Sequence, residues 1–141
     1  MLVELAHFSM ILALVLTAVQ AIFGLTGGAR NDERWMRAAR AAVAAQVVCT
    51  GLGVAGLVHA FIGNDFSVLY VAQNSNSALP LFYRVAALWG AHEGSMVLWI
   101  AILALWTTAF ALSSRQLPRT VVARALGVLG LVSCGFLLFT L

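Results

Sequence analysis

Charge is scarce in this sequence. Charged residues make up 9% of the 141 residues, whereas a soluble domain carries roughly a quarter. Hydrophobic residues make up 62% and lie in runs long enough to span a bilayer. This excludes an ordinary soluble protein and indicates an integral membrane protein. At this length we expect one membrane domain, residues 1–141, without a separate soluble domain.

Other features are missing as well. The two cysteines, Cys49 and Cys134, each lie in an apolar run, where they favour helix packing over redox pairing. No C-x-x-C-H motif occurs, which excludes a c-type cytochrome. No basic residue precedes the first apolar run, so we expect that run to be a retained anchor rather than a cleaved signal. No nucleophile triad, phosphate loop or catalytic carboxylate pair is found.

The apolar runs predict an all-α integral membrane protein with four transmembrane helices, at about 5–25, 41–62, 95–112 and 123–141. We expect the glycines at 24, 27 and 28 to end the first helix, because glycine is common at helix C-termini. Gly56, Ala60 and Gly63 form a ridge of small residues that predicts close helix packing.

The arginines predict the orientation of the chain. All eight basic residues are arginines, and seven of them lie in two clusters around 30–40 and 115–124, whereas the segment 63–94 holds only Arg84. The positive-inside rule then places loops 26–40 and 113–122 in the cytoplasm and makes 63–94 an external loop. The N-terminus is predicted to be periplasmic.

The segment from Pro80 to Leu112 is too long for one span, because it would make about 50 Å of helix against a core of about 30 Å. We expect a break near 90–94, with an interfacial helix at 80–89 before the third span. Its aromatic residues Phe82, Tyr83 and Trp89 would anchor it beside Arg84. Within the external loop, alternating apolar residues at 66–70 suggest a short extended piece.

The stretch "WGAHEGSMVLW" (89–99) places ionisable residues at the mouth of an apolar run. On a helix, Trp89, His92, Met96, Trp99 and Trp106 would lie near one face, with Glu93 close by. Such a wall suits a planar cofactor such as haem or quinone, although interfacial anchoring is the commoner role of aromatic residues. His92 and Glu93, adjacent near the hydrocarbon core, favour a functional or obligatory packing role, in contact with other helices, the loop or Arg84.

All three histidines are predicted at one membrane face. His7 lies near the start of the first span and His59 near the end of the second, while His92 precedes the third. Three histidines at one level can bind a metal or haem, but no H-x-x-H or H-E-x-x-H spacing occurs. We therefore favour interfacial placement for His7 and His59 and predict no metal site.

One string identifies a family. The stretch "YVAQNSNSALPLFYRVAALWGAHEGSMVLW" closely resembles the N-terminal part of CcmF, the cytochrome c-type biogenesis protein or haem lyase. The start "ELAHFSMILALVLTAVQ" and the end "RALGVLGLVSCGFLLFTL" resemble the same family. The resemblance implies the bacterial inner membrane, or the mitochondrial equivalent, and haem b in the full-length family. It also implies delivery of haem to apocytochrome c at the periplasmic face, with the haem chaperone CcmE and CcmH as partners.

The sequence also departs from the family. Full-length members carry a tryptophan-rich WWD motif and four haem-ligating histidines, which are expected outside this segment, so His92 does not inherit a ligand role. We expect a fragment or split-gene subunit that is not active alone and that needs the remaining part of CcmF. The candidates for haem handling or motif packing are Trp89, His92, Glu93, Trp99, Tyr83 and Arg84.

Two alternatives remain open. In the first, the motif has a purely structural role: small residues around it fix helix packing, and the chain is a membrane assembly module. In the second, the chain is a small quinone or transport subunit of a respiratory complex, although its polar residues within the spans are few. Among them, Gln20 and Gln46 are expected to bond between the first two helices.

Overall fold

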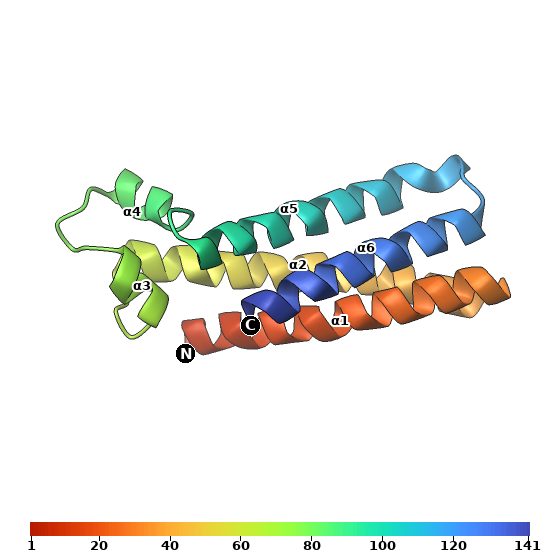
Figure 1. Cartoon of the computed structure of the whole chain (residues 1–141), viewed down its shortest axis with the longest axis horizontal. Helices are drawn as coiled ribbons and strands as arrows, with labels where there is room; N and C mark the ends of the chain where they lie inside the picture. The colour runs from red at the N-terminus through yellow and green to blue at the C-terminus, as the bar shows by residue number, and fades with distance from the viewer.

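Four long helices run side by side in the computed structural model, which describes residues 1–141 (Figure 1). They are α1 (Leu2–Arg30), α2 (Glu33–Gly63), α5 (His92–Ser113) and α6 (Arg119–Thr140). Two short helices, α3 (Leu69–Asn74) and α4 (Leu81–Ala87), lie between α2 and α5, and a 3-10 turn, η1 (Ser114–Gln116), precedes α6. All four long helices are long and apolar enough to cross a membrane. The predicted all-α class with four such helices is confirmed.

The two ends of the bundle differ in charge. The α1–α2 and α5–α6 connections meet at one end, which carries seven of the eight arginines and which we call the arginine end. The opposite end holds residues 64–91 with α3 and α4, and we call it the loop end (Figure 1). Each long helix overlaps one predicted span, and the sidedness of the two ends stays a prediction.

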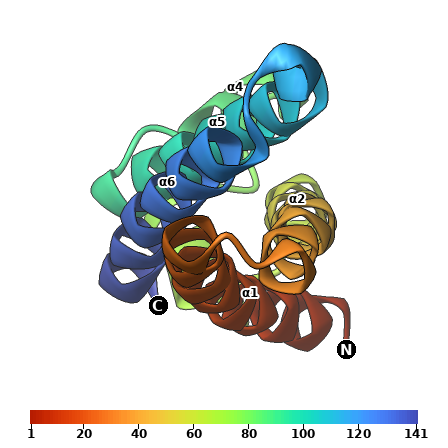
Figure 2. The same ribbon diagram turned by 90° about the vertical axis from the view of Figure 1, so that its right-hand side faces the viewer.

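Helix α1 lies at the centre, between α2 and α6 (Figure 2). Glycines let α1 and α6 approach closely: a Cβ atom on Gly24 would lie 2.6 Å from the carbonyl oxygen of Ala123, and one on Gly127 would lie 2.8 Å from the backbone nitrogen of Leu25. Small residues of this kind allow backbone contact between helices in lipid, where packing drives association. The α1–α6 contact therefore depends on glycines, which have no side chain to separate the two backbones.

The glycines at 24, 27 and 28 do not end α1, so that prediction was wrong. They are buried within the helix, where a Cβ on Gly27 would lie 2.9 Å from the Cβ of Trp35. The helix ends instead at Asn31, which has a left-handed conformation (φ 54°) and donates its N–H toward Gly27. Asp32 then caps α2 by accepting a hydrogen bond from the N–H of Arg34 at 2.9 Å. The link between the two helices is therefore very short.

The predicted small-residue ridge on α2 is partly right. Gly56 faces Ala6 of α1 and Ala60 is 1% exposed, whereas Gly63 has no neighbour near its Cβ position. Gly53, which the sequence did not single out, faces Met10. The contact surface is thus shifted toward the middle of α2.

The predicted bond between Gln20 and Gln46 does not form. The amide nitrogen of Gln20 donates to the carbonyl oxygen of Leu126 on α6 at 2.7 Å. Gln46 is buried and neither of its amide atoms has a hydrogen-bond partner. The close α1–α6 contact brings the backbone carbonyl of Leu126 within hydrogen-bond distance of Gln20, which takes the place of the predicted partner.

Helix α5 is the least buried of the four. It contacts α2 and α6, and its outer face exposes Trp99 (59%) and Trp106 (71%). On a helix able to span a membrane, lipid or another protein can cover such exposed tryptophan side chains.

Candidate functional site

Residues 64–91 fold back onto the end of α2. Val71 of α3 and Leu88 after α4 are fully buried against Ala60 and Phe61 of α2. The ring of Tyr70 meets that of Phe61 edge to face, with centroids 5.5 Å apart. The predicted extended piece at 66–70 is wrong, because the chain turns at 64–68 and then forms α3, which directs Tyr70 and Val71 at this core.

The Tyr70 hydroxyl joins α3, the end of α4 and the start of α5. It donates to the carbonyl oxygen of Leu88 at 2.8 Å and accepts from the N–H of Gly94 at 3.0 Å. The first N–H groups of a helix have no partner within the helix, so Tyr70 caps α5 from a distance. Burial raises the pKa of Tyr70 above its usual value of 10.0, which keeps the proton needed for the bond to Leu88.

Gly94 is the residue that permits this contact. A Cβ atom at this position would overlap both the carbonyl oxygen of Leu88 and the Tyr70 hydroxyl. No side chain fits there, because van der Waals repulsion from these two oxygen atoms would exclude a Cβ atom. The glycine of the HEGS stretch is therefore required by packing.

Arg84 ties α4 to α2. Its Nε donates to the carbonyl oxygen of Leu79 at 2.8 Å, and its Nη1 donates to that of Ile62, near the end of α2, at 3.2 Å. The last carbonyl groups of a helix lack intrahelical partners, so a guanidinium satisfies one of them. Arg84 thus holds the loop fold, and it makes no ion pair with Glu93.

The predicted single face from Trp89 to Trp106 is interrupted. The helical path breaks between Ala87 and His92, so Trp89 is not part of α5 and the spacing rule does not apply across the break. His92 begins α5 and its ring lies 5.8 Å from that of Phe139 on α6. Tyr83 is exposed on α4, and Trp99 is exposed two turns into α5. The six candidate residues therefore lie in three places: on α4, in the turn after it, and on α5.

Glu93 faces a cavity of about 560 Å³ at the loop end. All four long helices and α3 contribute to its lining, which is mostly apolar, with His7, Tyr70 and Gln73 among the polar residues. No group of three or more His, Cys, Asp or Glu side chains is arranged to hold a metal ion, and both cysteines are free. The cavity offers one carboxylate and one imidazole within an apolar wall.

The loop end carries more carboxylates than arginines. Glu4, Asp65 and Glu93 lie there with Arg84 as the one arginine. Hydrogen bonds from the Ser67 hydroxyl at 2.5 Å and the Ser67 N–H at 3.2 Å lower the pKa of Asp65. Asp65 is therefore ionised at neutral pH and fixes the turn between α2 and α3.

The sequence predicts close packing by the small residues around the motif, Gly94 among them, but it does not single out Tyr70. A signal was available for Tyr70, because a phenol among apolar residues usually finds a hydrogen-bond partner when buried. Its partners could not be identified, since Leu88 and Gly94 lie 18 and 24 positions away.

Comparison with known proteins gives consistent matches. No protein-family model matches the chain. The cytochrome c-type biogenesis protein CcmF of Pseudomonas aeruginosa is 50% identical over 139 residues, which are 99% of this chain and 21% of that protein. CcmF of Escherichia coli is 44% identical over all 141 residues, 22% of its length. A solved structure of the cytochrome c haem lyase CcmF matches 97% of this chain and 23% of its own, with a TM-score of 0.90 and 27% identity.

These matches cover the whole chain but a limited part of each relative, since this chain spans about a fifth of their length. The helices and the loop end described above lie within the matched region. The resemblance read from the motif string is confirmed: over essentially its whole length, the chain is similar in sequence and fold to the N-terminal part of CcmF, the cytochrome c-type biogenesis protein.

Proposed function

We propose that this chain is part of a haem lyase in cytochrome c maturation. Its loop end would contribute to the surface at which haem is delivered and attached to apocytochrome c. The observation that carries this proposal is the match to CcmF over the whole chain, in sequence and in fold. Because the chain spans about a fifth of its relatives' length, we propose that it acts together with the remaining part of CcmF and not alone.

Within that surface, we assign two roles to the WGAHEGS motif. Gly94 and the backbone of Leu88 form the fixed part, held by Tyr70. Trp89, His92 and Glu93 are exposed beside it and are the groups available to a haem or a partner. A fixed backbone that presents exposed side chains is the arrangement a binding surface needs.

The membrane placement is part of the proposal. The clustering of seven arginines at one end supports a cytoplasmic arginine end in the bacterial inner membrane, with the N-terminus and the loop end periplasmic. Helix α4 would lie along the outer interface, supported by the exposure of Phe82 (79%) and Tyr83 (61%) beside Arg84.

The cofactor and partners follow from the family. We propose haem b as the cofactor of the full-length protein, bound by residues outside this chain. CcmE, CcmH and apocytochrome c are the proposed partners, and the loop end is the surface offered to them.

The test is co-expression of this chain with the rest of CcmF in a host that lacks its own copy. His92→Ala and Glu93→Ala are compared with His59→Ala, which changes an exposed histidine of α2 that also lies at the loop end. Covalently attached cytochrome c haem and the amount of membrane-inserted protein are both measured. Loss of attached haem at normal protein level in the motif variants, but not in His59→Ala, supports a haem-handling role. Unchanged haem attachment and assembly in both motif variants would contradict that role.

A purely structural module is the second candidate. The close approach at Gly94 and the backbone bonds of Arg84 favour it, because both fix the loop fold without exposing a ligand group. In that case the motif variants lower the protein level and haem attachment in the same proportion.

A further inference from the structure

A second cavity, of about 370 Å³, lies at the arginine end. Its lining comes from α2, from η1 with the residue that follows it, and from the start of α6. Four of the lining side chains are guanidinium groups: Arg37, Arg40, Arg115 and Arg119. Glu33 is the one carboxylate among them.

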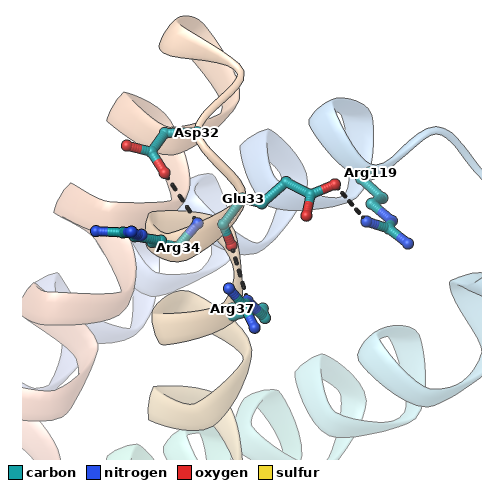
Figure 3. A network of polar contacts seen from close by, with 5 residues as sticks. All are labelled: Asp32, Glu33, Arg34, Arg37 and Arg119. Carbon is teal, nitrogen blue, oxygen red and sulfur yellow. Dashed lines mark hydrogen bonds and ion pairs between the residues drawn. The ribbon is translucent and has the colours of Figure 1, made fainter.

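The positive charge of this cavity is mostly uncompensated. Glu33 forms its ion pair with Arg119, with Oε1 and Nη1 2.5 Å apart, while Arg37 donates to the backbone carbonyl of Glu33 at 3.4 Å (Figure 3). The side chains of Arg40 and Arg115 have no hydrogen-bond or ion-pair partner. Three guanidinium groups thus line one cavity without a carboxylate partner, and an anion bound among them would reduce the repulsion between their like charges.

The chemistry that fits is a phosphate. Guanidinium groups bind phosphate oxygens with paired, charge-assisted hydrogen bonds, and several arginines converging from different elements surround such a group. The cavity lies at the ends of helices that are able to span a membrane, which is the level of lipid headgroups. Met36 and Leu117 add apolar surface beside the arginines, as an acyl chain requires and a free phosphate does not.

We propose that this cavity binds the phosphate of an anionic lipid headgroup. The site is at the opposite end of the bundle from the motif and goes beyond the proposed haem-lyase role. Basic pockets between membrane helices are suited to anionic headgroups. A bound headgroup would bridge α2 and α6, which are linked at this end by the exposed Glu33–Arg119 pair.

The experiment is native mass spectrometry of the full chain in neutral detergent, with phosphatidylglycerol or phosphatidylcholine added. Arg37→Gln/Arg40→Gln removes two lining guanidiniums that make no hydrogen bond or ion pair with another helix. The matched control, Arg30→Gln/Arg34→Gln, removes the same charge at the same end from side chains outside the cavity. Arg115→Gln tests the lining from a second element. Circular dichroism checks that each variant keeps its helices.

We expect retention of phosphatidylglycerol over phosphatidylcholine, and a loss of about tenfold in apparent affinity for Arg37→Gln/Arg40→Gln. Arg115→Gln should also weaken retention, and the control pair should retain the lipid. Equal losses in both double variants would overturn the proposal, since they indicate diffuse charge. Equal retention of the two lipids would overturn it too. Displacement of the lipid by millimolar inorganic phosphate would assign the site to a soluble phosphate compound instead.

Discussion

The hydroxyl of Tyr70 accepts a hydrogen bond from the backbone N–H of Gly94 at 3.0 Å, although the two residues are 24 positions apart. The same hydroxyl donates to Leu88 at 2.8 Å. One side chain of α3 therefore fixes both the end of the loop and the beginning of α5. The fold of residues 64–91 and the position of the WGAHEGS motif are a single structural unit.

Tyr70→Phe tests this unit. The change keeps the ring against Phe61 but leaves the N–H of Gly94 and the buried carbonyl of Leu88 without a partner. We expect a loss of about 1–3 kcal/mol in the free energy of unfolding, with faster hydrogen exchange of the Gly94 amide. Tyr83→Phe is the matched control, because Tyr83 is exposed and its hydroxyl makes no hydrogen bond. Equal exchange rates in the two variants would contradict the role of Tyr70.

Alkaline pH should loosen the same unit. The pKa of Tyr70 is raised above 10.0 by burial, so the unfolded tyrosine loses its proton before the folded one does. The contribution of Tyr70 to stability is thus complete below about pH 10 and decreases as the pH rises above that value. Thermal unfolding between pH 8 and about pH 11 measures the effect. Tyr70→Phe should remove this part of the pH dependence, and an unchanged profile in that variant would assign it to other groups.

Gly94→Ala should be severely destabilising. The added methyl group would overlap the Leu88 carbonyl and the Tyr70 hydroxyl, and we expect a cost of about 3 kcal/mol or more. Gly90→Ala is the control within the same motif, because its Cβ would meet Ala87 at 3.4 Å, a normal contact distance. Thermal unfolding in detergent compares the two, and similar midpoints would show that the close approach at Gly94 is not maintained.

Gly127→Ala should weaken the central helix pair. Its Cβ would lie 2.8 Å from backbone and side-chain atoms of Leu25, so α1 and α6 must move apart, at a cost of about 1–3 kcal/mol. Gly135→Ala lies on the same helix with no neighbouring atom near its Cβ position and should be neutral or stabilising. A cysteine cross-link between α1 and α6 at the lipid-facing edge, formed more slowly only in Gly127→Ala, would report the separation directly.

The parts that sequence predicted well depend on local chemistry. Long apolar runs need a helix to satisfy their backbone groups in lipid, so the four helices follow from composition alone. The break before His92 followed from length. The glycines of α1 were misread because a glycine has the same local signal at a helix end and at a helix contact. Only the positions of α2 and α6 decide between the two.

The site was harder to predict for the same reason. The helical spacing that joined Trp89 to Trp99 assumed one continuous helix, and the turn at Leu88–Ala91 removes Trp89 from that face. The interfacial position predicted for Arg84 stays a prediction, and the bonds of its guanidinium to Leu79 and Ile62 could not be read from its neighbours in sequence. Gln46 could not be assigned a partner, and it has none within the bundle. Each of these outcomes depends on contacts between elements, which periodicity does not encode.

The pairing of α1 with α6 also sets a time order for assembly. Arg124 of α6 bonds to the carbonyl oxygen of Gly28, 96 positions earlier in the chain. At roughly 5–20 residues per second, the ribosome needs roughly 5–20 seconds to make that stretch. Once α2 has been made, α1 and α2 can pair, whereas the glycines of α1 that face α6 still lack their partner helix. The contact between α1 and α6 forms only after α6 has been made, so any factor that binds newly made helices has its longest access to the glycine face of α1.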